Sequence, residues 1–438
     1  MRLQPVDEIF KPLVFCVMPY GVRCHPETGQ STDFDRVYRE LMVPAAEAAG
    51  CRAIRSDHEM SGGMIHTSMF ERLLLADVVV ADISIPNPNV FYELGIRHAT
   101  RPRATITIGN LSGAYIPFDI APLRHLTYTL DEDTSGGDGF RAILAERIQS
   151  GTKELTMVDS PLFSLVAGYP GIELSHEHAE SYRDRVNSIL TWRSQLSLAV
   201  GQKDRAGVDE LVETCGGNLE LIVDAVLAYR DLEAYDSMIQ LIEANERFAS
   251  SGSGIELAAF ARNRRGLPGD RVYALQTLEE LVQREGMTSE RGSLMGRIHK
   301  DGWLEARTQG SKEAKPLLYR AIDAYRRGFE ADPRDPYPGV NAVTLCALAG
   351  LESELTKISP VVAFAIARRG GLQVRDYFDM AALCELCCAT GDEDTAREAA
   401  MLALGKPHPT WARASTARNL RLLGEVRPLA GELSTLFE

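Results

Sequence analysis

Hydrophobic residues change their spacing along the chain, and the first part of the sequence alternates between two periods. Short apolar runs bounded by Gly, Pro or Asp are typical of buried strands, and they occupy residues 13–20, 51–57, 77–84 and 104–109, with an edge strand expected at 125–130. Apolar residues at helical spacing occupy 34–50, 61–76, 87–101 and the stretch around 140–148, while the glycine-rich stretch 136–139 is expected as a loop. This alternation predicts an α/β parallel sheet with helices on both faces.

Beyond about residue 180 the strand pattern disappears and one helical pattern follows another. Small, aromatic, small and proline positions at offsets typical of the second helix of a tetratricopeptide-like repeat are Ala321, Tyr325, Gly328 and Pro333. A looser copy consists of Ala396, Ala400, Ala403 and Pro407. We therefore expect an all-α, tetratricopeptide-like solenoid that presents a concave binding face.

These patterns divide the sequence into three parts. Residues 1–150 are predicted to form the α/β domain and residues 181–438 the helical repeat domain. Residues 151–180 contain Gly, Pro and isolated apolar residues without a period, and we expect them to form a packed connector.

Composition narrows the class of protein. The 438 residues are 45% hydrophobic and 25% charged, as in soluble globular proteins. No apolar run approaches the roughly 20 residues that span a bilayer, and Asp7 and Glu8 interrupt the N-terminal stretch where a signal core would lie. The eight cysteines are then expected as reduced thiols in a cytoplasmic protein. A net charge of −14 without a basic stripe disfavours nucleic acid as a partner.

Polar residues gather at predicted strand ends, where parallel sheets bind ligands. Candidate substrate-binding residues on this rim are Pro19, Tyr20, Gly21, Asp57, Asp82 and Asn89. Asp82 ends the strongest predicted strand and is a candidate partner for a sugar hydroxyl. Asp57 is a candidate partner for ribose.

The helix after this strand carries the candidate catalytic residue, Glu93. Asn87 is predicted to cap the helix and Pro88 to take its first position. Asn89 and Glu93 are four residues apart and share one face, so we expect Asn89 to orient a carboxylate that points into the crevice. A fixed anion there stabilises the cation-like sugar carbon that forms when an N-glycosidic bond breaks, or attacks it. The alternative is a solvated surface glutamate.

Gly95 follows Glu93 in the same helix. A glycine inside a helix costs about 1 kcal/mol relative to alanine. We therefore expect close packing on the sheet at this position.

The stretches "ADVVVADIS", "NPNVFYELGIRHA" and "PFDI" resemble the nucleoside 2-deoxyribosyltransferase-like and TIR-like superfamily over residues 12–150. This resemblance implies a flavodoxin-like fold and a glutamate essential for cleaving N-ribosyl bonds in nucleosides or NAD, which by position is Glu93. It also implies a homo-oligomer, because related enzymes complete their sites across a subunit contact. The rest of the chain, from "DSPLF" onward, is similar to the TRAF-binding regulatory region of stress-activated MAP kinase kinase kinases.

One departure from the transferase pattern bears on substrate choice. Asn87 and Asn89-Val90 stand where the transferases have an Asp and Gly-Thr, which disfavours protonation of a departing base. We therefore expect a glycosidase acting on NAD or a related nucleotide under the control of a helical-repeat sensor that binds a protein partner or activator. By resemblance the setting would be bacterial defence or stress signalling. The alternatives are a salvage deoxyribosyltransferase and a non-catalytic nucleotide-binding scaffold.

Metal ligands and cofactors are not expected. Cys384 and Cys387 of "CELCC" have no second ligand pair and fall where a repeat helix needs small packed residues, so packing is predicted rather than zinc binding. The histidines of "HEH" at 176–178 have no third ligand nearby. NAD enters as a substrate, not as a cofactor.

Overall fold

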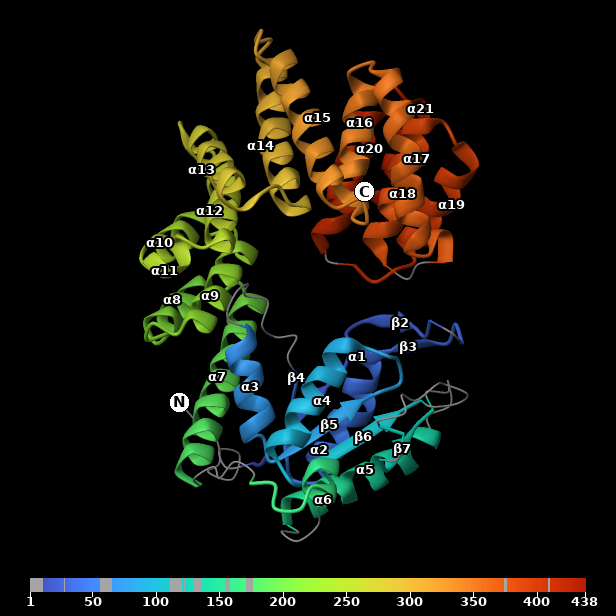
Figure 1. Ribbon diagram of the computed structural model, residues 1–438. Helices are drawn as coiled ribbons and strands as arrows, with labels where there is room; N and C mark the ends of the chain where they lie inside the picture. The colour runs from blue at the N-terminus through green and yellow to red at the C-terminus, as the bar shows by residue number, and fades with distance from the viewer. Residues whose placement is uncertain are drawn as a thin grey trace. The chain divides into compact units, whose positions relative to one another are not determined.

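The computed structural model describes residues 11–26, 28–55, 65–110, 120–121, 123–129, 135–153, 158–170, 176–373, 376–408 and 410–438 (Figure 1). The chain divides into two compact units, residues 1–225 and 226–438. The first contains a parallel sheet and the second is helical throughout the part that the structure describes.

The sheet of the first unit has five parallel strands in the order β4-β1-β5-β6-β7. Their bounds are Leu13–Val17 for β1, Arg52–Arg55 for β4, Val78–Asp82 for β5, Thr105–Gly109 for β6 and His125–Thr127 for β7. Counted along the chain this is the order 2-1-3-4-5 of flavodoxin-like sheets. The predicted α/β fold class and the predicted edge strand are confirmed.

Helices cover both faces of this sheet, as Figure 1 shows for the strands and the helices around them. One face packs on α1 (Phe34–Val37), the π-helical turn η2 (Tyr38–Met42), α2 (Val43–Ala48) and α5 (Ser135–Lys153). The other packs on α3 (Ile65–Leu75), α4 (Pro88–Thr100) and α7 (His176–Gly201). The strand β5 is buried along its whole length because apolar cores lie on both faces.

Two local features of this unit differ from the predictions. A short antiparallel pair, β2 (Val22–Cys24) and β3 (Ser31–Asp33), was not predicted, because its three-residue strands are too short for a period-2 signal. The loop predicted at residues 136–139 is wrong, since this stretch is the first turn of α5. Asp138 in that turn favours a helix N-terminus, and Phe140, Leu144 and Ile148 bury one face of the helix.

The remaining helices of the first unit follow the sheet. They are α6 (Pro161–Leu165) and α8 (Arg205–Glu213), and α9 (Leu219–Asp231) begins there. α7 belongs by sequence to the predicted repeat region, yet its Tyr182 and Val186 lie in the core on the α3–α4 face of the sheet.

The second unit consists of consecutive helices joined by short turns. Their bounds are Tyr235–Glu243 (α10), Glu246–Ala249 (α11), Gly252–Arg265 (α12), Asp270–Glu285 (α13), Ser289–Thr308 (α14), Ala314–Ala331 (α15), Pro336–Leu348 (α16), Glu352–Arg368 (α17), Gly371–Gln373 (η4), Tyr377–Thr390 (α18), Glu393–Leu404 (α19), Thr410–Leu423 (α20), Pro428–Ser434 (α21) and Thr435–Phe437 (η5). This confirms the predicted all-α region.

The repeat-like positions pack as their residue types require. Ala321 and Tyr325 of α15 are fully buried. A Cβ on Gly328 would lie 3.0 Å from the Cα of Gly292 in α14, and one on Gly296 would lie 2.6 Å from the ring of Tyr325. The small residues therefore let α14 and α15 approach closely. Pro333 follows the end of α15 at Ala331.

The cysteines of α18 lie in the hydrophobic core of the second unit. Cys384, Cys387 and Cys388 are all buried free thiols, as the packing interpretation predicts. Within the described ranges, no helix combines the length and the apolar character that a membrane span requires.

Candidate functional site

The carboxyl ends of β1 and β5 form the switch point of the sheet. β1 pairs with β4 on one side and with β5 on the other, so the strand order reverses here, and sheets of this kind bind ligands beyond the strand ends at such a point. Pro19, Tyr20 and Gly21 follow β1, and Asp82 ends β5. The structure therefore brings these predicted residues to one edge, whereas Asp57 lies outside the described residues.

The turn after β1 is held by α1. Gly21 adopts a left-handed φ of 63°, a conformation that favours glycine. Its carbonyl accepts a hydrogen bond from the Phe34 N–H at 3.0 Å, and its N–H donates to the Asp35 carboxylate at 3.3 Å. These two bonds fix the backbone that follows β1 at the switch point.

A cluster of one arginine and two aromatic rings, which sequence analysis missed, includes Tyr20. Arg55 ends β4 and is 7% exposed. Its guanidinium lies 5.2 Å from the ring centroid of Tyr20 and 4.6 Å from that of Tyr38, and it forms an ion pair with Asp35 at 2.9 Å. The available signal was an arginine near the end of the predicted strand 51–57, but its aromatic partners come from distant elements.

Asp82 is fully buried in a hydrogen-bonded network. Its Oδ1 accepts hydrogen bonds from the Ser84 N–H at 2.9 Å and the Ser84 hydroxyl at 2.6 Å, and its Oδ2 accepts from the Tyr128 hydroxyl at 2.7 Å. Ser84 also accepts from the Asn110 N–H at 2.8 Å. Burial raises the pKa of Asp82 to about 6 although these bonds oppose the shift. This network fixes the turn that leads into α4.

The start of α4 follows the sequence prediction. The Asn87 side chain accepts hydrogen bonds from the N–H groups of Asn89 and Val90 at 2.9 and 3.4 Å, and Pro88 takes the first helical position, so the predicted cap is confirmed. Val90 and Leu94 are buried in the core on this face of the sheet. The cap and these apolar contacts set the orientation of the helix.

Glu93 lies on the flank of this buried face. Its side chain is partly buried, and within the described ranges it forms no hydrogen bond or ion pair. Desolvation by burial raises the pKa of this carboxyl to about 7. Asn89 is exposed and makes no hydrogen bond to Glu93 among the described residues. A half-desolvated carboxyl that ionises near neutral pH is suited to proton transfer or to stabilising a nearby cation.

The expected reason for Gly95 is wrong. A Cβ at this position would meet nothing within 4 Å in the part of the chain that the structure describes, and the residue is exposed. Close packing on the sheet therefore does not explain the glycine, because it faces away from the buried side of α4.

Arg97 is a second residue that sequence analysis missed. It is 0% exposed, and its guanidinium donates hydrogen bonds to the carbonyls of Leu73 at 2.7 Å, Ala76 at 3.1 Å and Ala104 at 3.3 Å. Burial lowers its pKa to about 9. These bonds tie α4 to the end of α3 and to the start of β6, which holds the helix that carries Glu93. No group of three or more potential metal ligands occurs among the described residues.

Comparison with known proteins identifies the helical part of the chain. The family described as "MAP3K TRAFs-binding domain" matches residues 209–435, more than half of the sequence. The chain is 31% identical over 217 residues to mitogen-activated protein kinase kinase kinase nsy-1 of Caenorhabditis elegans, covering 45% of this chain and 14% of that protein. It is 25% identical over 354 residues to mitogen-activated protein kinase kinase kinase 5 of Homo sapiens, covering 72% and 25%.

A third relative is mitogen-activated protein kinase kinase kinase 15 of Mus musculus, 29% identical over 215 residues, covering 47% of this chain and 16% of the mouse protein. The chain thus spans a quarter or less of the length of these curated relatives. The chain belongs to the family of proteins that contain the MAP3K TRAFs-binding domain.

Proposed function

We propose that this chain is a stress-signalling regulator whose α/β unit cleaves the ribosyl–base bond of NAD or a related nucleotide. The observation that carries the proposal is Glu93, a desolvated carboxyl on the helix that begins at the sheet's switch point, with no hydrogen bond or ion pair among the described residues. The resemblance of residues 12–150 to nucleotide-cleaving domains agrees with this reading.

The chemistry requires one carboxylate. The bond from ribose C1′ to the nicotinamide nitrogen breaks with its electron pair moving to nicotinamide, which leaves as a neutral molecule and needs no proton. The ionised Glu93 stabilises the developing cation at C1′ or bonds to it, and the positive charge favours the ionised form of the carboxyl. Water then attacks C1′, loses a proton and yields ADP-ribose. Deoxynucleoside transfer is disfavoured because most neutral bases leave only with protonation.

Substrate binding would use the rim at the switch point. Tyr20 is 39% exposed and stacks on the Arg55 guanidinium, so it offers a flat surface for a base. Asp82 is occupied by Ser84 and Tyr128, so its proposed contact with a sugar hydroxyl would have to compete with these bonds. Asp57 and Asn89 remain proposed contacts. A homo-oligomer is also proposed, on the resemblance alone.

The test compares three proteins incubated with NAD, NADP, ATP and deoxynucleosides, with freed base measured by chromatography. The parent should release nicotinamide, and Glu93→Gln should lower the rate about a thousandfold or more. Glu47→Gln, which removes an exposed carboxylate from α2, should keep the parent rate. NAD binding without turnover in the parent would reject the glycosidase in favour of a nucleotide-binding scaffold. Base exchange without hydrolysis would favour deoxyribosyl transfer.

We further propose that the helical region binds a protein partner, as the name of its family indicates for TRAF proteins. An exposed aromatic pair in this region resembles an interface hot spot: Phe378 and Trp411 are 45% and 62% exposed with ring centroids 5.6 Å apart. Trp411→Ala should weaken capture of a TRAF protein about tenfold or more, whereas Tyr319→Ala, on exposed α15 surface, should not. Equal capture by both variants would exclude this surface.

A further inference from the structure

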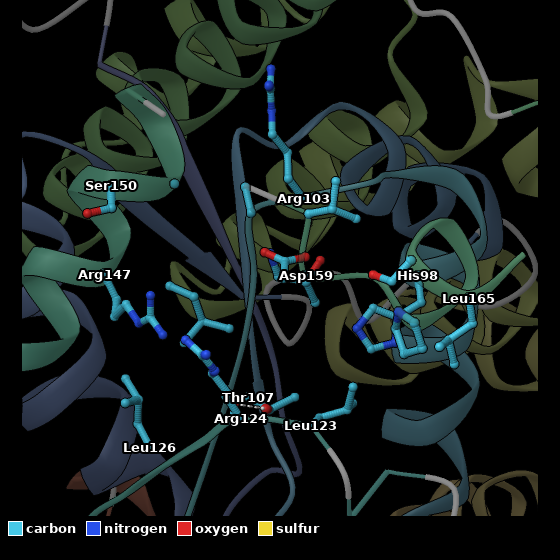
Figure 2. Close-up of a pocket in the computed structure, with 17 residues that line it drawn as sticks. His98, Arg103, Thr107, Leu123, Arg124, Leu126, Arg147, Ser150, Asp159 and Leu165 are labelled. Atoms are coloured by element: carbon cyan, nitrogen blue, oxygen red, sulfur yellow. Dashed lines mark hydrogen bonds between the residues drawn. The ribbon is translucent and has the colours of Figure 1, made fainter. Parts of the chain in front are cut away.

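A cavity of about 610 Å³ lies at the amino end of the sheet, opposite the edge at which α4 begins. Its walls come from the starts of β6 and β7, the last turns of α4 and α5, and the segment 158–165 that includes α6 (Figure 2). Its volume is that of a small-molecule site. It is separate from the switch point, because α4 and α5 reach it with their C-terminal ends.

Two arginines enter this cavity, and neither forms an ion pair among the described residues. Arg124 precedes β7 and is exposed, and Arg147 of α5 is half-buried. Within the described ranges neither guanidinium forms a hydrogen bond or an ion pair, although Arg147 interacts electrostatically with Asp159. Figure 2 shows the two side chains extending toward each other inside the cavity. Arg103 extends away from the centre of the cavity in the same view.

Asp159 supplies a hydrogen-bond acceptor in the same cavity. Its Oδ2 accepts a hydrogen bond from the Thr105 N–H at 3.0 Å, which ties the segment before α6 to the start of β6. Its Oδ1 is buried and accepts no well-formed hydrogen bond among the described residues, although the nearby Ala104 N–H acts on this carboxylate and opposes the rise of its pKa. A buried carboxylate oxygen without a well-formed hydrogen bond is unfavourable, so a donor on a ligand would be bound strongly here.

The rest of the wall suits a partly apolar ligand. Val158 and Leu165 line the cavity and are 48% and 83% exposed, so they offer aliphatic surface to a ligand. The His98 ring also lines it, and its pKa is lowered to about 4 by burial and by the charge of Arg97, so the imidazole is neutral at pH 7. A neutral ring and aliphatic side chains can pack against a flat ligand.

We propose that this cavity binds a small metabolite that carries a phosphate monoester. The phosphate lies between Arg124 and Arg147, a hydroxyl or amino group donates to Asp159 Oδ1, and the ligand body packs on the apolar wall. A phosphate suits the site better than a carboxylate because its several oxygens can engage two guanidinium groups from different directions. The proposal does not depend on the activity assigned to Glu93.

The test measures binding of AMP, ribose 5-phosphate, succinate and adenosine to the full chain by calorimetry. AMP and ribose 5-phosphate should bind, and adenosine and succinate should bind at least about tenfold more weakly than AMP. Arg124→Gln and Arg147→Gln should each weaken AMP binding about tenfold. Lys153→Gln is the matched control, because Lys153 is exposed on α5 outside the cavity.

The location is checked by hydrogen exchange. AMP should slow amide exchange in residues 158–165 of the parent and not of the double arginine variant. AMP affinity unchanged in the double variant would overturn the proposal, because AMP would then bind elsewhere. Equal affinities for adenosine and AMP, or no binding of either phosphate at millimolar concentration, would also overturn it.

Discussion

Two charged side chains removed from solvent, Lys300 in the helical unit and Glu93 in the α/β unit, differ in whether the protein supplies them with partners. In the helical unit, Lys300 is 3% exposed and its ammonium donates to Asn341 Oδ1 at 3.4 Å and to Asn419 Oδ1 at 3.2 Å. Asn419 in turn donates to Glu385 Oε1 at 3.1 Å. In the α/β unit, the partly buried Glu93 has no such partner among the described residues. A buried charge with protein partners indicates a structural role, whereas a buried charge without such partners indicates a ligand-binding role.

The causes of the pKa shifts also differ between the partnered groups and Glu93. Burial lowers the pKa of Lys300 to about 8 and raises that of Glu385, and each charge opposes the shift of the other. The pKa of Glu93 is raised by burial alone. Arg97 belongs with the partnered class, although its partners are carbonyl oxygens rather than a carboxylate. We therefore expect that replacing a partnered charge by a neutral residue lowers the free energy of unfolding strongly, and that replacing Glu93 does not lower it.

The largest effect is expected for Arg97→Met. The change removes donors from the carbonyls of Leu73, Ala76 and Ala104 and leaves them buried. We expect a loss of about 3 kcal/mol or more in the free energy of unfolding, measured by urea denaturation of the α/β unit's transition. Arg39→Met, an exposed change in η2, should cost less than about 0.5 kcal/mol. Similar values for both variants would show that the carbonyl contacts contribute little.

A smaller loss is expected for Lys300→Met. The change leaves Glu385 buried beside Asn419 without a positive charge nearby, and we expect a loss of about 2–4 kcal/mol at pH 7. Adding Glu385→Gln should restore much of this loss, because the uncompensated charge is then gone. Lys357→Met, which breaks an exposed ion pair with Glu354, should cost less than about 1 kcal/mol. Additive effects of the Lys300 and Glu385 changes would contradict the coupling.

The features that the sequence predicted are those with local causes. The strand β5 is an uninterrupted apolar run, and the Asn87 cap involves residues two and three positions away. The parallel α/β sheet and the position of Glu93 on the helix after β5 followed from these elements and from the resemblance. Such signals depend on the spacing of residues along the chain, so they can be recognised in a single sequence.

The features that sequence analysis missed depend on contacts between residues that are distant in the sequence. Arg55 stacks on Tyr20 and Tyr38, and Tyr128 donates to Asp82 across 46 positions of sequence. No spacing rule connects these residues, because each pair meets only when the sheet forms. The cavity that contains Arg124 and Arg147 was not predicted for the same reason, because its walls come from segments that are far apart in the sequence. Gly95 shows the converse error, since a tertiary cause was assigned to a position that has open space around it.

The smallest effect, and the one with the opposite sign, is expected for Glu93→Gln. The folded-state pKa of Glu93 is about 7 against an ordinary value of 4.5. A raised carboxyl pKa stabilises the fold fully below pH 4.5 and loses this contribution as the pH rises through 7. The variant should therefore gain stability relative to the parent between pH 4.5 and 7, reaching about 1 kcal/mol above pH 7.

The measurement is urea denaturation of the parent and of Glu93→Gln at several pH values from 4.5 to 8. Glu47→Gln is the control, because its carboxylate is exposed on α2 and its stability difference should not change with pH. If Glu93 faced solvent, the stability difference between Glu93→Gln and the parent would not change with pH, as expected for Glu47→Gln. A glutamate that stabilised the fold through an unseen partner would make the glutamine variant less stable at pH 8. If Glu93 is desolvated at a site that binds a cationic group, Glu93→Gln should lose turnover and gain stability together. The ionised carboxyl is then required for catalysis but is unfavourable for folding.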